Sequence, residues 1–349
     1  MIALSNATIS FPMFGENFSL NFSRYFTLFG RNFYWYGVVI ALGFVLAAVY
    51  IMRRRKQFGL TDDNVIDILI WAIVAGVVGA RLYYVIFEFD QFRGASFGET
   101  LLNIVRIWNG GLAIYGAIIA GMLALVLYCR RKKLSLGNVL DLSSFAVLIG
   151  QILGRWGNFF NREAYGAETD LPWKMGLTTE AGTIYVHPTF LYESLWNLIG
   201  FLILHFFSKK HRKYDGQIFL MYLTWYGFGR FFIELLRQDS LRIGGENGVR
   251  VSCIVAAISV VFGVFMLIRN RNCTKLTPAL ADGKAEGAAD AAGADAVPEA
   301  QTENADEAYE SDEYEDDEYE DDEYEDDGYE AEAEAPAASD GEKTDQTQE

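Results

Sequence analysis

Four residues that carry a charge or a phenol occur at helical spacing in one apolar segment. In TWYGFGRFFIELLRQDS, Tyr226, Arg230 and Glu234 follow each other at intervals of four residues, and Arg237 comes three residues later. A helix would place these side chains along one stripe. A charge at the centre of a membrane-spanning helix costs about 2.5–3.5 kcal/mol, so pairing or function must retain it. The stripe therefore predicts either a site inside a helical bundle or an Arg230–Glu234 pair that only joins helices.

A second polar cluster ends another apolar segment. Residues Gly154–Gly166 have the sequence GRWGNFFNREAYG, in which Arg155, Asn158, Asn161 and Glu163 fall within nine residues. A guanidinium matches phosphate oxygens in a bidentate fashion, and glycines let the backbone approach a ligand. The cluster predicts a cradle for a phosphate headgroup, although a loop rich in Asn and Gly is also compatible with simple helix capping.

Charge and hydrophobicity are segregated along the chain of 349 residues, which is 51% apolar and yet has a net charge of −17. From Leu276 to Glu349 there are 29 acidic residues and two lysines, whereas residues 1–275 hold 17 acidic and 27 basic residues. This composition excludes a soluble two-domain enzyme. Tyrosines recur in YEDDE units of the acidic segment, and its low apolar content predicts disorder.

Seven segments of the basic part are long and apolar enough to cross a bilayer core of about 30 Å as helices. They are approximately 34–52, 65–88, 107–129, 136–157, 188–207, 216–237 and 249–268. Clusters of Lys and Arg follow the first, third, fifth and seventh segments. The positive-inside rule then predicts an outer N-terminus and a cytoplasmic C-terminus.

The expected fold is therefore an all-α polytopic membrane protein with about seven transmembrane helices. We expect residues 1–33 to lie outside, a membrane domain over 34–272 with a small external cap near 158–187, and a disordered acidic cytoplasmic tail over 276–349. The sequence has no CxxC pair, no HExxH motif and no GxxxxGK[ST] loop, and its three histidines lack metal-ligand spacing. We accordingly expect no metal, no cofactor and no nucleic-acid partner.

The stretch GRWGNFFNREAYG resembles the G-R-x-G-N-F-x-N-x-E-x-x-G motif of the bacterial prolipoprotein diacylglyceryl transferases. The resemblance covers about residues 30–270 and does not extend to the acidic tail. It includes, in chain order, the blocks YWYG, GARLYYVIF, WNGGLAIYG, HPTFLYE and YGFGRFFIELLRQ. Six ordered blocks make it more specific than a single motif.

Members of this family transfer a diacylglyceryl group from phosphatidylglycerol to the thiol of the lipobox cysteine of a prolipoprotein, and glycerol phosphate leaves. The resemblance implies this activity, a multi-pass location in the bacterial plasma membrane, and phosphatidylglycerol, the prolipoprotein signal peptide and the bilayer as partners. The catalytic residues it implies are Arg155, Arg230, Tyr115, Tyr226 and Glu234. The residues implied to bind phosphatidylglycerol are Arg155, Asn158, Asn161, Glu163, Gly166, Tyr36 and Arg230.

Tyr115 departs from the family pattern, because some members have at this position a histidine that is proposed as the base. A phenol titrates near 10, so only about one in a thousand is ionised at neutral pH. We expect Tyr115 to donate a hydrogen bond, to line the pocket or merely to pack, while the arginines or Glu234 activate the thiol. Matched family positions with a structural role at least as plausible as a direct one are Arg81, Asp141, His187 and Glu193.

Two other classes of protein remain as alternatives. A transporter of an anionic solute would also place arginines inside a helical bundle, but it predicts inverted repeats that the sequence lacks. A scaffold protein would use the tail, which could bind a basic cytoplasmic partner, but it would not need Arg155 and Arg230 within apolar segments. We favour the transferase and expect truncation after about Lys275 to leave transfer intact, because a cytoplasmic segment cannot reach an outer site.

Overall fold

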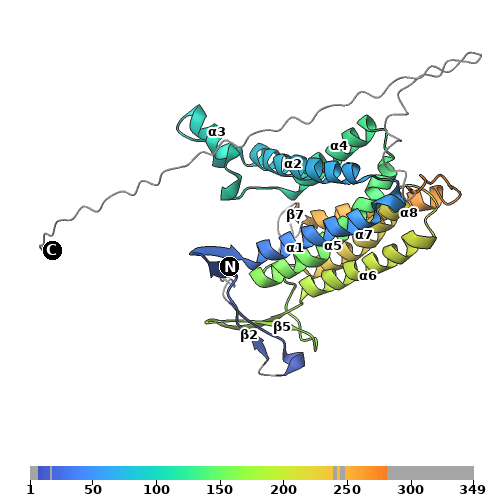
Figure 1. Cartoon of the computed structure of the whole chain (residues 1–349). Helices are drawn as coiled ribbons and strands as arrows, with labels where there is room; N and C mark the ends of the chain where they lie inside the picture. Colours follow the sequence, from blue (N-terminus) through green and yellow to red (C-terminus); the bar gives the residue numbers. More distant parts are fainter. Residues whose placement is uncertain (1–6, 16–17, 239–241, 244–247, 281–349) are drawn as a thin grey trace, which may run out of the picture. The chain divides into compact units, whose positions relative to one another are not determined.

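Helices make up most of the described residues in the computed structural model, which covers residues 7–15, 18–238, 242–243 and 248–280. The α-helices are α1 (Trp35–Arg54), α2 (Asp62–Phe87), α3 (Phe97–Val105), α4 (Ile114–Arg131), α5 (Leu136–Asn161), α6 (Thr189–Lys210), α7 (Gln217–Leu236) and α8 (Val251–Arg269) (Figure 1). Short 3-10 helices are η2 (Pro12–Phe14), η3 (Arg55–Phe58), η4 (Phe89–Phe92) and η5 (Ile107–Asn109).

Six helices of the described chain are long and apolar enough to cross a membrane: α1 together with η3, and α2, α4, α5, α6 and α8. Helix α7 has 20 residues but carries Arg230 and Glu234, and it lies outside this group. The prediction of a mostly helical, polytopic membrane protein is therefore confirmed. Each of the seven segments predicted to cross the bilayer overlaps one of these six helices or α7.

The structure corrects the expected start of the third segment. Residues 107–109 form η5, and α4 begins only at Ile114. Between them, Gly110 and Gly111 adopt φ values of 89° and 78°, a left-handed conformation that glycine adopts at little cost and that interrupts a helix. Helix α3 and several short strands are further elements that the all-α expectation did not include.

Helix α5 is the hub of the bundle, because it packs against α1, α6 and α7, whereas α2 packs mainly on α4. Its first turn is capped by the Ser135 hydroxyl, which accepts from the backbone N–H of Asn138. Its last turn ends at Arg162, whose φ of 53° is left-handed. The helix therefore runs unbroken past Arg155.

A reciprocal contact between two tryptophans joins α6 to α7. The indole rings of Trp196 and Trp225 stack with centroids 4.3 Å apart, and each indole N–H donates to the backbone carbonyl of the other residue, at 3.0 and 2.9 Å. A Cβ at Gly200 would lie 2.4 Å from the Trp225 ring, and one at Gly229 would lie 2.1 Å from the Trp196 ring. Glycine at both positions lets the helices approach and sets their register.

Residues near the N-terminus pair with the segment between α5 and α6. The antiparallel sheet has the order β2 (Ser19–Leu20), β1 (Thr8–Ser10), β5 (Met175–Thr179) and β6 (Gly182–Val186), with Ile9 opposite Leu177. Buried side chains of this sheet pack on Phe159 of α5 and Phe190 of α6. Two further hairpins are β3 (Tyr25–Leu28) with β4 (Arg31–Tyr34), and β7 (Arg242–Ile243) with β8 (Val249–Arg250).

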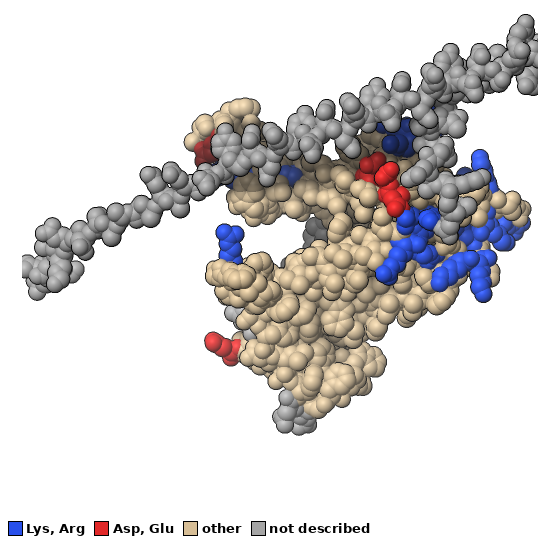
Figure 2. Space-filling view, viewed as in Figure 1, with Lys and Arg blue, Asp and Glu red and all other residues tan. Residues whose placement is uncertain are grey.

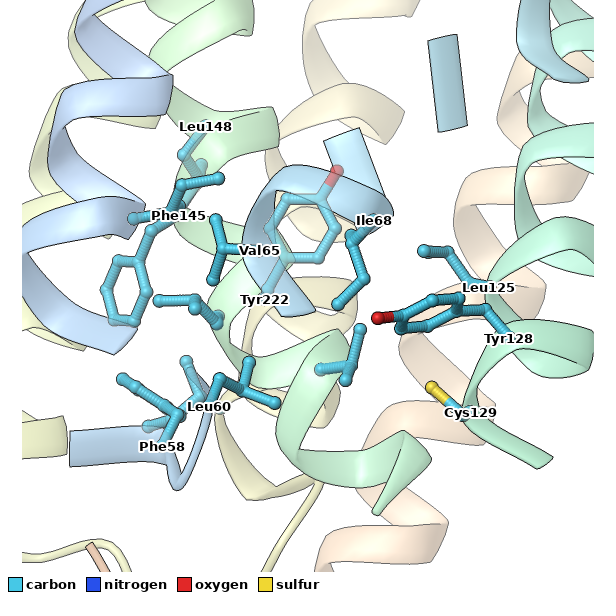
Figure 3. Packing of buried hydrophobic residues seen from close by; sticks show 14 of the residues in the cluster. Phe58, Leu60, Val65, Ile68, Leu125, Tyr128, Cys129, Phe145, Leu148 and Tyr222 are labelled. Atoms are coloured by element: carbon cyan, nitrogen blue, oxygen red, sulfur yellow. The ribbon is translucent and has the colours of Figure 1, made fainter. Parts of the chain in front are cut away.

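The largest hydrophobic core lies toward the opposite end of α5. Phe145 and Leu148 of α5 meet Val65 of α2 and Ile218 of α7, and Leu125, Tyr128 and Cys129 of α4 complete the cluster (Figure 3). At the same end, Asp141 accepts from the backbone N–H groups of Gly216 and Phe219 and pairs with Arg212. A buried carboxylate thereby caps the start of α7.

Lysine and arginine gather at this end of the bundle, which we call the basic end (Figure 2). Its clusters are Arg53–Lys56 after α1, Arg130–Lys133 after α4, Lys209–Lys213 after α6 and Arg269–Lys275 after α8. The chain beyond α8 is fastened here. Thr277 donates its backbone N–H and its hydroxyl to Asp215, and the backbone N–H of Leu280 donates to the carbonyl of Lys56. Residues 277–280 therefore contact the body, and the rest of the predicted tail, 281–349, lies outside the described residues.

The ionised carboxylate of Asp215 binds the segment after α8 through Thr277. Burial alone would raise the pKa of its carboxyl, but hydrogen bonds from Ser135 and Thr277 and the charge of Arg212 hold that pKa below its usual value. Ionised Asp215 therefore contributes its full stabilisation of the folded protein above about pH 3.9, the pKa of an Asp in the unfolded chain. This contribution is lost as the pH falls through the lower pKa of Asp215 in the folded protein.

We predict that truncation after Leu280 leaves the melting temperature unchanged, whereas truncation after Lys275 lowers the stability by about 1–3 kcal/mol because Asp215 loses buried hydrogen bonds. Thermal unfolding of both purified proteins in detergent at pH 7 measures the difference, which should disappear well below pH 4. Equal melting temperatures at pH 7 would show that the contacts of Thr277 and Leu280 are energetically idle.

Candidate active site

Glu193 of α6 connects the two arginines that the sequence singled out. Its Oε1 lies 3.1 Å from Nη2 of Arg155 on α5, and its Oε2 lies 2.9 Å from Nη1 of Arg230 on α7. The Glu193 side chain is 3% exposed, whereas those of Arg155 and Arg230 are 22% and 15% exposed. One buried carboxylate thus bridges three helices and leaves both guanidiniums partly accessible.

Three of the four residues of the predicted polar stripe, Tyr226, Arg230 and Glu234, lie on α7. The helix ends at Leu236, so Arg237, which has an extended backbone, is not part of the stripe. Arg230 Nη2 lies 2.6 Å from Oε2 of Glu234, one turn along the helix. Tyr226 lies one turn before Arg230 and is close enough to both arginines to interact with them electrostatically. Its ring stacks on that of Tyr222, with centroids 5.8 Å apart. The stripe therefore joins the Glu193 bridge rather than forming an isolated pair.

The residues that follow Arg155 extend this network to the end of α5. Arg155 Nη1 donates to Oδ1 of Asn158 at 3.0 Å, and the side-chain amides of Asn158 and Asn161 both donate to Oε1 of Glu163, at 2.8 and 3.3 Å. Glu163 is exposed. We call the connected set Arg155, Asn158, Asn161, Glu163, Glu193, Arg230 and Glu234 the arginine–glutamate cluster.

Three expected site residues lie beside this cluster or apart from it. The Tyr36 ring packs on Gly157, where a Cβ would lie 2.6 Å from the ring. Gly166 donates its backbone N–H to the carbonyl of His187 and bridges to Arg237 after α7. Tyr115 is half-buried in the first turn of α4. Within the described part of the chain, no hydrogen bond joins Tyr115 to the arginine–glutamate cluster.

Arg162 belongs to the same sequence motif as Arg155 but has a structural role. Its guanidinium is directed at backbone carbonyls: Nε donates to Ala7 at 2.8 Å, Nη1 to Phe160 at 2.8 Å, and Nη2 to Phe22. The guanidinium also lies 4.7 Å from the centre of the Phe22 ring, a cation–π distance. With only 4% of its surface exposed, Arg162 fastens the N-terminal strands to the end of α5.

Arg81 is a second buried arginine that stabilises backbone. It is 6% exposed and donates to the carbonyls of Ile104 and Gly111, at 2.7 and 2.9 Å, among others in the connection between α3 and α4. This contact holds the loop that precedes Tyr115. Of the other family positions, Asp141 caps α7, and His187 lies 3.2 Å from the Tyr192 hydroxyl. Burial lowers the pKa of His187, so this imidazole is neutral at pH 7 and adds no charge to the site.

The central position of Glu193 is the feature that sequence reasoning missed. Spacing along one helix can identify the Arg230–Glu234 pair, but Glu193 meets both arginines across helix interfaces, and its place in HPTFLYE gave only a family match. The chemistry available is that of guanidinium, carboxylate, carboxamide and phenol groups. Over the residues that the structure describes, no group of three or more His, Cys, Asp or Glu side chains is arranged to hold a metal ion.

Comparison with known proteins assigns a family to this arrangement. The family profile described as prolipoprotein diacylglyceryl transferase matches residues 24–269. The chain belongs to this family. A protein of Finegoldia magna named phosphatidylglycerol–prolipoprotein diacylglyceryl transferase is 43% identical over 244 residues, which cover 70% of this chain and 94% of that protein.

Proteins with the same name in Enterococcus faecalis and Clostridioides difficile give similar matches. The first is 40% identical over 257 residues, covering 71% of this chain and 90% of its own length. The second is 38% identical over 248 residues, covering 71% of this chain and 96% of its own length. The region matched by the family profile includes every residue of the arginine–glutamate cluster and ends before the acidic segment.

We predict that Arg162→Gln lowers the free energy of unfolding by about 3 kcal/mol, because it removes charge-assisted hydrogen bonds to buried carbonyls. Thermal unfolding in detergent measures the loss, and proteolysis of the N-terminal strands should accelerate in parallel. Arg93→Gln is the matched control, since Arg93 is 68% exposed, forms an ion pair with exposed Asp90 and lies over the exposed Phe89 ring, and it should change stability little. A variant Arg162→Gln as stable as this control would show that the carbonyl contacts carry no weight.

Proposed function

We propose that this protein is a phosphatidylglycerol–prolipoprotein diacylglyceryl transferase that forms a thioether with the lipobox cysteine of a prolipoprotein and releases glycerol phosphate. The observation that carries the proposal is the pair of guanidiniums that share the Glu193 carboxylate, within helices that are expected to lie in the membrane. The family and the names of the relatives from three bacteria support the same reaction.

The arrangement suits a phosphodiester substrate. Glu193 and Glu234 neutralise the guanidiniums, which reduces the cost of placing two cations in an apolar segment. Only some of the N–H groups of each guanidinium bind these carboxylates, so the remaining N–H groups can bind phosphate oxygens. Glu193 forms ion pairs with both Arg155 and Arg230. It therefore orients the remaining N–H groups of the two guanidiniums before substrate binds.

The reaction requires charge stabilisation on the leaving phosphate. The substrate sulfur attacks the glyceryl carbon, the C–S bond forms, and the bond from that carbon to the phosphate oxygen breaks. Negative charge then grows on the phosphate, where prearranged donors can each contribute about 10²–10³ in rate. Arg155 and Arg230 are the groups that we assign to this task.

The thiol must also lose a proton, since a cysteine with a pKa of about 8.5 is mostly protonated at pH 7. The carboxylates of Glu193 and Glu234 lie beside the two arginines and are the groups available to accept this proton. We assign proton uptake to Glu234, because Glu193 is shared by two cations. Tyr226 and Tyr115 are proposed as hydrogen-bond donors at the reaction centre.

The remaining residues are proposed to hold the lipid. Asn158, Asn161 and Glu163 present amide and carboxylate groups at the accessible end of α5, where they can bind the hydroxyls of a glycerol headgroup. Tyr36 and Gly166 border this region and are assigned to shaping it. The precursor would present its lipobox cysteine to the same end.

We infer that the basic end is cytoplasmic and that the opposite end, with the arginine–glutamate cluster, faces the outside of the plasma membrane. The four basic clusters at the ends of α1, α4, α6 and α8 support this orientation. It requires α7 to cross as a seventh span, with its charges turned into the bundle. Residues 281–349 would then be cytoplasmic, as proposed from their composition, and could bind a basic partner.

The direct test is incubation of the purified protein with phosphatidylglycerol and a lipobox peptide, followed by mass spectrometry. We expect a peptide that carries a diacylglyceryl thioether, and we expect none when phosphatidylglycerol is replaced by phosphatidylcholine. Absence of the product from a folded preparation would overturn the proposed function.

Replacement of Arg155 or Arg230 by Ala is predicted to lower turnover by about 10²–10³ or more. Glu193 keeps the other arginine as a partner in each variant, and size-exclusion chromatography in detergent verifies that each variant folds. Lys at either position should also be poor, since an ammonium lacks the planar fork. Near-full turnover by either Ala variant, compared with Arg93→Ala as the control, would remove that arginine from the site.

A positioning role for Glu193 predicts a particular kinetic change in Glu193→Gln. The amide cannot orient both guanidiniums, so kcat should fall by about 10–100-fold. The KM for phosphatidylglycerol should not rise, because one negative charge that repels phosphate is removed. Initial rates at varied lipid content measure both constants. A higher KM at unchanged kcat would indicate that Glu193 contributes to lipid binding only.

A further inference from the structure

A groove of about 470 Å³ lies between α2 and α4, and none of its lining residues belongs to the arginine–glutamate cluster. Its walls are apolar and include Trp71, Val78 and Leu82 of α2 and Leu123 and Leu127 of α4. About half of the surface of each of these side chains is exposed. Both helices are long and apolar enough to cross a membrane, so a groove between them would lie at the depth of the hydrocarbon core.

The floor of the groove is formed by a close helix–helix contact. A Cβ at Gly79 of α2 would lie 2.2 Å from Cβ of Ala120 on α4, and one at Gly116 would lie 2.3 Å from the carbonyl oxygen of Gly79. The two backbones therefore approach at this point, while the larger side chains on either side stand apart. The hollow is a consequence of the sequence of the α2–α4 pair and has a fixed shape.

One end of the groove is positively charged. Arg131 and Lys132 line it, both are exposed, and no carboxylate in the described residues forms an ion pair with either. Asp67 also lines this end, where it accepts a hydrogen bond from the Tyr128 hydroxyl at 2.9 Å. Two cations outweigh one hydrogen-bonded carboxylate, so the mouth of the groove attracts anions.

The dimensions match a lipid chain. The groove runs along α2 from Asp67 to Leu82, which at 1.5 Å per residue is about 22 Å. One leaflet contributes about 15 Å of hydrocarbon to the bilayer core. The groove therefore has room for a whole acyl chain beneath a headgroup placed at Arg131 and Lys132.

We propose that this groove binds an anionic phospholipid from the leaflet at the basic end, with one acyl chain between α2 and α4 and its phosphate at Arg131 and Lys132. The charge complementarity, the apolar walls and the length favour this occupant. Its charged mouth lies at the opposite end of the bundle from the arginine–glutamate cluster, and none of its lining residues belongs to that cluster. The groove is therefore separate from the proposed substrate site and does not depend on the proposed function.

Trp71 provides the measurement, because it lies in the groove near the charged mouth. The protein is reconstituted in vesicles of phosphatidylcholine that contain increasing fractions of brominated phosphatidylglycerol, and bromine quenches tryptophan fluorescence on contact. The same titration with Trp71→Phe isolates the contribution of this residue. Repeating it with brominated phosphatidylserine and brominated phosphatidylcholine separates recognition of charge from recognition of a particular headgroup.

We expect Trp71 to be quenched preferentially by both anionic lipids over brominated phosphatidylcholine. The preference should fall by roughly fivefold for each basic residue removed in the double variant R131Q/K132Q. The matched control R130Q/K133Q removes the same charge from the same helix end, but outside this groove, and should retain the preference.

Two results would overturn the proposal. The first is equal quenching of Trp71 by anionic and zwitterionic lipids in the unmodified protein. The second is an equal loss of preference in the two double variants, which would indicate general attraction of anionic lipid to the basic end. All four residues are exposed, so both variants should fold, and size-exclusion chromatography in detergent verifies this.

Discussion

The carboxylate of Glu193 is the constraint around which this bundle is organised. A charge inside an apolar segment is costly unless a partner reaches it, and Glu193 serves two partners at once, Arg155 and Arg230. For both ion pairs to form, α5, α6 and α7 must meet at one level with a fixed register. The Trp196–Trp225 pair and the cap that Asp141 provides for α7 supply that register. The site is thus as rigid as the helix packing behind it.

The two ends of the bundle use similar groups for different purposes. At the basic end, the carboxylate of Asp215 is saturated by Arg212, Ser135 and Thr277, so its charge serves folding alone. At the other end, Arg155 and Arg230 keep accessible surface and unused N–H groups while their carboxylate partners are buried. At the basic end, no described group of the Asp215 network is left to bind a ligand. At the other end, the two arginines keep donors that a ligand can use, which is what a proposed binding site requires.

Local patterns in the sequence predicted the helices and the Arg230–Glu234 pair, because helical spacing fixes which neighbours meet on one face. They assigned no role to Arg162, seven residues after Arg155 in the same motif, because its partners include carbonyls that the distant N-terminal strands bring to it. Nor could they place Glu193, whose partners lie on other helices. The late start of α4 was missed because Gly110 and Gly111 interrupt an otherwise apolar run. Contacts between distant segments decide the first two, and the local conformation of the two glycines decides the third.

The interlocked indoles of Trp196 and Trp225 also limit how a bilayer molecule can reach the arginines. Sideways passage between α6 and α7 would require both indole hydrogen bonds and the ring stack to break together. The interface of α7 with α8 is similarly tight, since a Cβ at Gly227 would lie 2.8 Å from the carbonyl oxygen of Ala256. The α6–α7 and α7–α8 interfaces are therefore both closed to a lipid. A lipid that moves sideways from the bilayer to the arginines must therefore pass along another face of the bundle.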